Sequence, residues 1–337
     1  MKKILAVCLI LTVGAFCAFA GGGKEPAAAQ GGQGKVILRF GHTLTEQDLF
    51  HKGYLAWSKA VAEKTSGNLQ IDVFANSQIG VEEDVLEQIR QGANIGWQTD
   101  FARAGTYIRE MGVLNLPYFL ENLDDVKKLL KSPTVNGWCE QLATQIGLRP
   151  LSYTFVQGYR NIYANKEAKN PGDMKSLRIR TANAASWVES IRSLGAVPVA
   201  LNYGYMYNGI QTKVVDGCEI PYNAALNLKI YEVCKYILET KHIFQLQLCV
   251  VSETWYKKIP ANFQKILAEE LVNEGFIISK ELEAAHEQSK QTMIKNGMTL
   301  IPYAQMDIAA FRKSSQSAYD VLKLADARKA VYADIGK

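Results

Sequence analysis

Arginines at the ends of short β-like segments are the residues of this chain most suited to bind a ligand. Arg178 and Arg180 are two residues apart in SLRIR, and Arg160 begins the segment RNIYAN. A guanidinium beyond the end of a parallel strand can hold a carboxylate through two hydrogen bonds. Arginine is rarely buried without a partner. The alternative is therefore that Arg160 and Arg180 pair with Asp or Glu across the sheet.

Strand alternation puts Arg178 and Arg180 on the same face of their strand. We expect strand twist to carry Arg178 towards solvent. Aromatic residues that could cover the organic part of a ligand lie nearby in sequence or precede the arginines: Trp187, Tyr203, Tyr205, Tyr207 and Trp97.

Carboxylates that could act as catalytic bases are few and unpaired. Asp216 is followed by Gly217, which is first of all a turn signal, and Glu219 follows shortly after. Glu82 and Glu83 form another acidic pair. An exported enzyme that uses Glu219 or Asp216 as a base is therefore an alternative hypothesis.

Several functional classes have no motif in this sequence. The chain has no G-x-G-x-x-G after a strand, no G-x-x-x-x-G-K-[ST] and no G-x-S-x-G. Four histidines and no zinc-type cysteine spacing argue against a metal site. A net charge of +5 without a basic block argues against nucleic acid as a partner. We predict neither a cofactor nor a metal.

The N-terminus has the pattern of an export signal. Residues 1–20 combine Lys2 and Lys3, an apolar stretch and the sequence Ala18-Phe19-Ala20, which is typical of a signal peptide. A membrane anchor and a lipid on Cys17 are the alternatives. Residues 21–35 are rich in Gly, Ala and Gln and indicate a flexible tether.

The remaining cysteines form no recognisable pattern. Free thiols and a disulfide are both left as alternatives for these four residues, Cys139, Cys218, Cys234 and Cys249.

From residue 35 onwards the periodicity alternates between strand and helix, which predicts an α/β sheet protein. Strands are expected at 35–43, 68–80, 148–155, 160–165 and 196–201, and helices at 49–67, 81–94, 184–195 and 262–296. Residues 203–221 read as a helix-like stretch, a turn and then a strand. The last helix is long and contains one glycine, Gly275.

Several segments resemble those of one known protein family, in the same order and spacing and over nearly the whole mature chain. They include HKGYLAWSKAVAEKTSGNLQIDVFANSQIG, LNLPYFLENLDDV, GYRNIYANKEAKNPGDMKSLRIR, LGAVPVALNYGYMYNGIQTKVVDGCEIP, YEVCKYILETKH and SETWYKKIPANFQKIL. The sequence resembles the extracytoplasmic solute-binding subunits of TRAP transporters, the DctP-like proteins.

The resemblance implies a two-lobed periplasmic-binding-protein-like α/β fold with a long helix spanning both lobes. It implies one lobe of residues 36–157 plus 246–285, and another of residues 158–245 plus 286–337. It implies closure of these lobes on a ligand that carries a carboxylate.

The resemblance also assigns roles to individual residues. It implies that Arg180 pairs with the ligand carboxylate and that Arg160 is a second ligand arginine. Asn183 matches a cleft position of the family, and Tyr203 lies where relatives place an aromatic residue over the ligand. Glu83, with its neighbour Glu82, lies on a helix start that often contributes a polar contact.

Two positions depart from the family pattern. Ile220 follows Glu219 in DGCEIP, where many relatives have Asn or Trp, and Tyr205 stands where a glutamate is usual. Both changes predict a more apolar pocket, which argues against sialic acid, C4-dicarboxylates and metal-bridged keto acids. We therefore expect a monocarboxylate with a hydrophobic or aromatic body, such as an aromatic amino acid or its oxo acid.

The sequence thus predicts a periplasmic binding protein rather than an enzyme. It would capture a small organic acid and deliver it to membrane subunits of the Q and M type. It would touch the membrane only through a partner or a lipid anchor. A carrier or sensor of lipid-like molecules that lack a carboxylate is the alternative.

Overall fold

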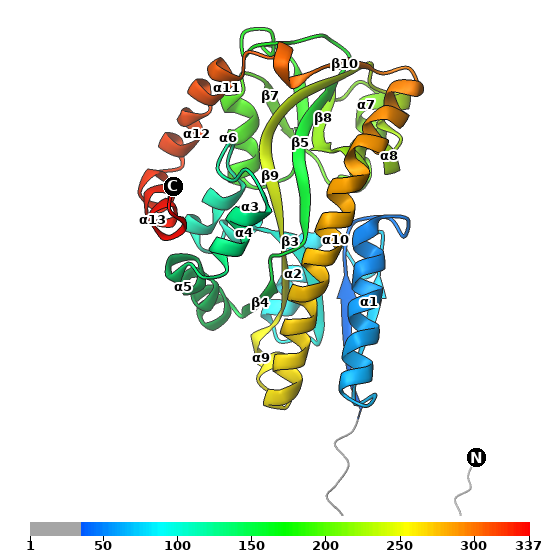
Figure 1. Ribbon diagram of the computed structural model, residues 1–337, viewed down its shortest axis with the longest axis vertical. Coiled ribbons are helices and arrows are strands. Elements are labelled where there is room, and N and C mark those ends of the chain that lie inside the picture. Colours follow the sequence, from blue (N-terminus) through cyan, green and yellow to red (C-terminus); the bar gives the residue numbers. More distant parts are fainter. Residues whose placement is uncertain (1–34) are drawn as a thin grey trace, which may run out of the picture. The chain divides into compact units, whose positions relative to one another are not determined.

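The computed structural model describes residues 35–337. The predicted signal peptide, Cys17 and all but the last residue of the tether lie outside the described residues. Within the described range, the elements form a mixed α/β structure around one central sheet (Figure 1).

Parallel strands form both ends of this sheet. At one end β1 (Val36–Gly41) lies between β2 (Leu69–Phe74) and β3 (Ile95–Asp100). At the other end β6 (Arg178–Thr181) lies between β8 (Gly217–Pro221) and β7 (Val197–Ala200). Each end is the core of one lobe, and the α/β expectation is confirmed.

Two long antiparallel strands join the ends. β9 (Tyr236–Ser252) pairs with β3 through residues 247–251 and with β5 (Val156–Ala164) through residues 236–246. β5 continues the sheet to β8. The short strands β4 (Leu148–Ser152) and β10 (Thr299–Ile301) also pair with β9. The sequence did not predict β9, which is buried along most of its length.

The sequence predicts the main helices closely, and their bounds lie within four residues of the expected ones. They are α1 (Leu49–Lys64), α2 (Glu82–Arg90), α6 (Ala185–Ser193) and α10 (Ala261–Lys295). Asp48 caps α1, because its side chain accepts the Phe50 N–H at 2.9 Å. α2 has three acidic residues in its first turn and Arg90 in its last, which suits the helix dipole.

Shorter helical segments fill the connections. After β3 come α3 (Phe101–Ala104), η1 (Arg109–Asn115), α4 (Leu123–Leu129), α5 (Pro133–Gln141) and η2 (Leu142–Ile146). Further along are η3 (Tyr203–Tyr205), α7 (Met206–Gln211), α8 (Tyr222–Asn227), η4 (Ile230–Glu232) and α9 (Glu253–Tyr256). The chain ends in η5 (Tyr303–Gln305), α11 (Ile308–Ser314), α12 (Gln316–Val321) and α13 (Ala325–Ile335).

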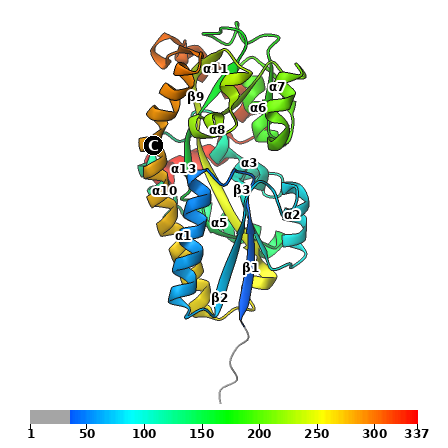
Figure 2. The same cartoon turned by 90° about the vertical axis from the view of Figure 1, so that its right-hand side faces the viewer.

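The long helix α10 packs along α1 and across β5 (Figure 2). Trp57 of α1 donates its indole N–H to the Leu267 carbonyl at 3.0 Å. Gly275 lets α10 approach the sheet closely, since a Cβ there would lie 2.1 Å from the Thr154 hydroxyl oxygen. Ser279 accepts the Val156 N–H at 2.7 Å and so fixes α10 at the start of β5.

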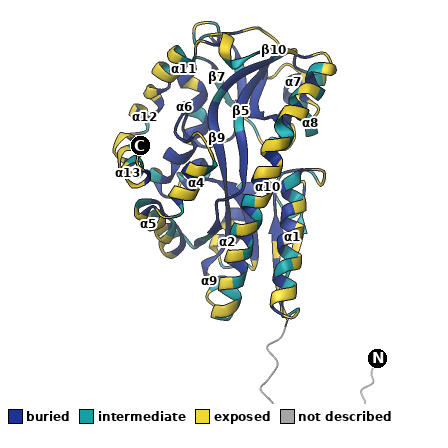
Figure 3. Cartoon of the chain, in the orientation of Figure 1, coloured by how far each residue is buried: buried dark blue, intermediate teal, exposed yellow. Residues whose placement is uncertain are grey.

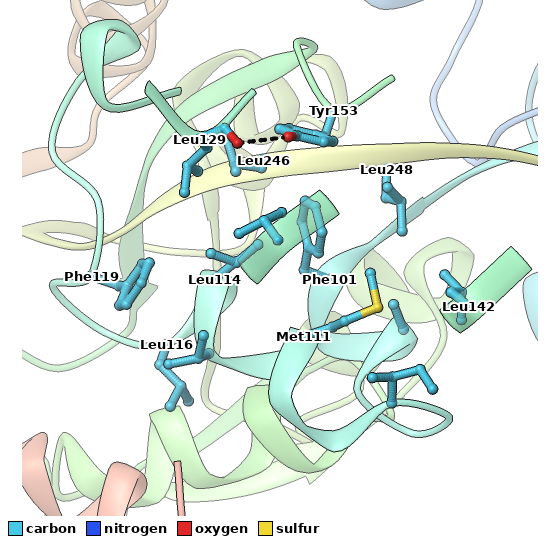
Figure 4. Packing of buried hydrophobic residues seen from close by; sticks show 14 of the residues in the cluster. Phe101, Met111, Leu114, Leu116, Phe119, Leu129, Leu142, Tyr153, Leu246 and Leu248 are labelled. Carbon is cyan, nitrogen blue, oxygen red and sulfur yellow. Dashed lines mark hydrogen bonds between the residues drawn. The ribbon is translucent and has the colours of Figure 1, made fainter. Parts of the chain in front are cut away.

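The strands are buried and the outer faces of the helices are exposed (Figure 3). The largest apolar cluster lies between β9 and the helices that follow β3. It includes Phe101, Met111, Leu114, Leu246 and Leu248 (Figure 4). This packing holds the end of β3 rigidly, and that strand end reaches the cleft described below.

The C-terminal helix α13 packs against the helices that follow β3. Its Val331 and Ile335 lie in the largest apolar cluster, together with residues of α4 and α5. The Ser132 hydroxyl of α5's N-cap also donates to the Asp334 carboxylate at 2.5 Å. α13 therefore belongs with α4 and α5. In residues 35–337 no helix is long and apolar enough to span a membrane.

Candidate functional site

A cleft of about 520 Å³, part of it open to solvent, lies where strand ends from both lobes meet. Its lining residues come from β3, β5, β6, β8 and β9 and from the loops and helices beside them. They include Gln98, Asp100, Arg103, Gln157, Arg160, Arg180, Trp187, Tyr203, Ile220, Gln245 and Gln247. Strand ends at this kind of crevice are the usual place for ligands in α/β sheets.

Arg180 is buried in this cleft without a carboxylate partner. It is 2% exposed, and its Nε donates to the Leu201 carbonyl at 2.7 Å. Among residues 35–337, no carboxylate oxygen lies within 4.0 Å of its guanidinium. Burial lowers the pKa of Arg180 to about 10, although the more distant charge of Glu219 opposes this drop, and the charge of Arg160 adds to it. The side chain stays protonated at neutral pH, so the cleft contains one cation that lacks a close counter-charge.

Arg160 has its counter-charge within the protein. Its Nε donates to the Glu219 carboxylate, its Nη2 to the Glu219 carbonyl and its Nη1 to Gln245 Oε1. The guanidinium lies 4.5 Å from the centre of the Trp187 ring. The ion-pair alternative raised from the sequence therefore describes Arg160 but not Arg180.

Glu219 lies behind Arg160 and is fully buried. Burial would raise the pKa of this carboxyl, but the charge of Arg160 and the nearby His242 ring, whose Nε2 lies 3.6 Å from Glu219 Oε2, hold it at about 2. The Thr181 hydroxyl donates to the other carboxylate oxygen at 2.8 Å. Burial lowers the pKa of His242, which keeps that ring neutral. Glu219 is therefore a charged positioning group with no free oxygen to act as a base.

A second charged network lies on the first-lobe side of the cleft. Arg103 pairs with Asp100 at 2.7 Å, with Glu82 at 3.3 Å and with Glu83 at 3.7 Å. Trp187 crosses from the second lobe and donates its indole N–H to Asp100 at 3.1 and 3.2 Å. Burial raises the pKa of Glu82 to about 7 although the charge of Arg103 opposes this. Glu82 can therefore exist as a neutral carboxyl, which donates a hydrogen bond.

Four glutamines line the floor of the cleft. Gln157 Oε1 accepts the Gln247 amide N–H at 2.8 Å, and Gln98 Oε1 accepts the Tyr54 hydroxyl at 2.8 Å. Gln245 Oε1 accepts a hydrogen bond from Arg160 Nη1. The amide N–H₂ groups of Gln98 and Gln245 therefore serve as donors. This lining is polar, so the expectation of an apolar pocket, drawn from Ile220 and Tyr205, does not hold.

The predicted site residues fall into three groups. Arg180, Arg160, Tyr203, Trp187 and Ile220 line the cleft, and Glu219 supports it from behind. Tyr205 and Glu83 line an adjoining cavity of about 640 Å³ at the cleft mouth instead. Asn183 is exposed and lines neither space.

Arg178 lies at the opposite end of its strand from the cleft. It pairs with Asp216 at 2.8 Å and its Nη2 donates to the Lys213 carbonyl at 2.9 Å. Its side chain is 43% exposed, which fits the expectation that it turns towards solvent.

Sequence reasoning missed the glutamines, Asp100 and Arg103. The alternation in FQLQL (244–248) signals a strand with Gln245 and Gln247 on one face, and TDFAR (99–103) places Asp100 and Arg103 three apart after a strand. In residues 35–337, no group of three or more His, Cys, Asp or Glu side chains is arranged to hold a metal ion.

Comparison with known proteins agrees with this fold. The fold has two lobes and matches crystal structures of TRAP periplasmic solute-binding proteins. One, from Escherichia fergusonii, is 31% identical with a TM-score of 0.78, covering 88% of this chain and 99% of that one. Another, from Haemophilus influenzae with bound L-gulonate, is 25% identical with a TM-score of 0.81, covering 90% and 99%.

Residues 40–325 match the profile of the DctP family, bacterial extracellular solute-binding protein family 7, and the chain belongs to that family. It is also 28% identical to the C4-dicarboxylate-binding periplasmic protein DctP of Vibrio cholerae over 277 residues. The match covers 80% of this chain and 81% of that protein. The family resemblance drawn from the sequence is confirmed.

Proposed function

We propose that this protein is a periplasmic binding subunit of a TRAP transporter that captures a monocarboxylate carrying several hydroxyl groups, such as a sugar acid. The observation that carries the proposal is Arg180, a buried cation whose missing counter-charge a ligand carboxylate would supply. A carboxylate held by a guanidinium gains charge-assisted, bidentate hydrogen bonds, and these strengthen where water is excluded.

The rest of the cleft favours hydroxyl groups on the ligand over an apolar body. The amide groups of Gln98 and Gln245 donate, and one buried carboxylate oxygen, Oε1 of Glu82, has no hydrogen-bond partner among the described residues. A hydroxyl group can both donate and accept, and so satisfies both kinds of group. The crystallised relatives with L-gulonate and L-galactonate bound are similar to this chain and support the same ligand class.

A second carboxylate on the ligand is disfavoured. Away from Arg180, the cleft presents Asp100 and Glu82, whose shared cation Arg103 is already paired with both. A dicarboxylate would bring its second carboxylate close to these acidic side chains, and this repulsion between like charges weakens binding. The ligand therefore differs from the C4-dicarboxylates named for the Vibrio cholerae relative.

The role we propose is capture and delivery without chemistry. Glu219 is fully engaged by Arg160 and Thr181, which leaves it unable to accept a substrate proton. The lobes would close on the acid and the closed form would dock on Q- and M-type membrane subunits. Export to the periplasm would follow from residues 1–20, with lipidation at Cys17 as the alternative mode of attachment.

Isothermal titration with matched ligands tests the proposal. L-galactonate should bind with one-to-one stoichiometry, and galactitol, which has the same carbon chain but no carboxylate, should not. Arg180→Gln should lose L-galactonate, while Arg178→Gln, on the same strand, should keep it. Tighter binding of phenylpyruvate or succinate than of any sugar acid would contradict the hydroxyl-rich ligand.

Native mass spectrometry of the purified protein addresses the alternative function. After denaturation, a released hydroxy acid would support the proposal. A released lipid or fatty alcohol without a carboxylate would instead support a carrier of lipid-like molecules, and Arg180 would then be a structural residue.

A further inference from the structure

A second cavity lies on the face of the central strands opposite the cleft. It occupies about 540 Å³, including space open to solvent, and it shares no lining residue with the cleft. Strand alternation explains the separation, because Arg160 points into the cleft and its neighbour Tyr159 lines the second cavity. We call this space the hinge cavity, and its lining residues are Tyr118, Leu120, Glu121, Tyr159, Lys241, Tyr303 and Arg312.

The hinge cavity is built on an irregular part of the sheet. Arg160 pairs with Ile243 and Ile162 with Leu238, so four residues of β9, 239–242, lie opposite the single residue Asn161. Lys241 lies in this bulge with a φ of 43°, and its N–H donates to the Asn161 side chain at 3.1 Å. Bulges redirect side chains, and here the bulge presents the Lys241 side chain to the cavity.

The segment bonded to this bulge has the same kind of backbone strain. Tyr118 has a φ of 58°, and its N–H donates to the His242 carbonyl at 2.7 Å. Its hydroxyl donates to the Thr240 carbonyl at 3.3 Å. Two non-glycine residues in the left-handed region thus line one cavity. Such conformations cost free energy and gather at ligand sites.

Two cationic side chains line the cavity, and each lies close to at least one tyrosine ring. The Lys241 ammonium lies 5.2 Å from the centre of the Tyr303 ring and 6.0 Å from that of Tyr159. The Arg312 guanidinium lies 4.7 Å from the centre of the Tyr118 ring. Two tyrosine rings therefore lie beside Lys241 and one beside Arg312, and both cations line the same cavity.

The two cations differ in how closely a carboxylate of the protein pairs with them. Arg312 pairs with Glu121 at 3.1 Å, the single carboxylate in the cavity lining. Lys241 has Glu239 at 4.0 Å, but Glu239 already accepts the Tyr222 hydroxyl at 2.6 Å and the Tyr303 N–H at 2.9 Å. Lys241 is therefore a half-exposed cation whose nearest carboxylate is engaged by closer donors.

From this geometry we infer that the hinge cavity is a second ligand site, which binds a small oxyanion of the carboxylate or phosphate class between Lys241 and Arg312. The tyrosine rings would flank the body of the anion and the two cations would hold its charge. This site is independent of the ligand proposed for the cleft, since the two spaces lie on opposite faces of the strands.

Isothermal titration of the full chain at low ionic strength, with inorganic phosphate and with benzoate, tests the inference. Both titrations use an Arg180→Gln background, which removes the anion-binding group of the cleft. We expect saturable binding of at least one probe at millimolar concentration. Lys241→Gln or Arg312→Gln should weaken it about tenfold or more, because each removes a charged hydrogen-bond donor.

Lys313→Gln is the matched control, because Lys313 neighbours Arg312 on α11 but does not line the cavity. It should bind as the background protein does. Binding of phosphate alone would define a compact oxyanion site, and tighter binding of benzoate would show that the rings select a flat organic acid. Binding of neither probe, or equal loss in Lys313→Gln, would overturn the inference.

Discussion

Replacing Arg180 by methionine should abolish acid binding and yet stabilise the ligand-free protein. Burial lowers the pKa of Arg180 to about 10. Each pKa unit corresponds to about 1.36 kcal/mol, so holding this charge in the fold costs about 3 kcal/mol. The substitution also removes the hydrogen bond from Arg180 to the Leu201 carbonyl, which is worth about 1 kcal/mol.

The expected net effect is an increase of about 1–2 kcal/mol in the free energy of unfolding. Urea unfolding followed by circular dichroism measures it, and titration with L-galactonate measures the loss of binding. Arg178→Met is the matched control on the same strand. Its ion pair with Asp216 is 43% and 31% exposed, so its removal should cost at most about 1 kcal/mol and leave binding unchanged.

A lower free energy of unfolding for Arg180→Met than for the wild type would refute this reasoning. It would mean that the fold compensates the Arg180 charge and that no ligand carboxylate is needed there. Retained L-galactonate binding in the same variant would refute the role of Arg180 directly.

Three further outcomes follow from buried groups. Folding raises the pKa of Glu82 to about 7. The neutral carboxyl therefore contributes up to about 3 kcal/mol to the free energy of unfolding below the unfolded pKa, and this contribution is lost as pH rises through 7. Urea midpoints between pH 5 and 8 should fall with pH more steeply in the wild type than in Glu82→Gln. Glu219→Gln should destabilise by about 3–5 kcal/mol, since it leaves the buried Arg160 charge unpaired, and a loss below 1 kcal/mol by the same assay would contradict the pairing. Gly158→Ala should lower the melting temperature, because its φ is 80° and a Cβ would lie 2.1 Å from the His286 ring; an unchanged melting temperature would show that His286 moves aside freely.

The local pattern predicts the lobes well, because each alternates short strands with capped helices. The residues that frame α1 and α2 show this most clearly: Asp48 caps the first, and acidic residues open the second. The pattern fails at β9, whose 17 residues are buried on both faces and show no strict alternation. It also does not place α13, whose position depends on a tertiary contact with α5.

The family resemblance in the sequence assigned Arg180 and Tyr203 to the ligand site, and both line the cleft. The glutamine floor was not predictable, because Gln98, Gln157 and Gln247 come from three strands and meet only through the register of β9 with β3 and β5. Ile220 and Tyr205 do not make the cleft apolar, since one contributes only part of the wall and the other lines the adjoining cavity.

The two charged networks of the cleft explain why one arginine is left for the ligand. Glu219 neutralises Arg160 on the second lobe, and Asp100 with Glu82 neutralises Arg103 on the first. Both networks are tied to Trp187, whose ring faces the Arg160 guanidinium while its N–H donates to Asp100 across the cleft.

Moving the lobes apart must break the Trp187–Asp100 hydrogen bond and also the bond from Asn227 to Asp48, at 3.1 Å. Neither bond involves Arg180. A ligand acid that engages Arg180 therefore adds to the closing contacts without displacing either of them, and it shifts the lobes towards the closed state by the amount by which it binds that state more tightly than the open one.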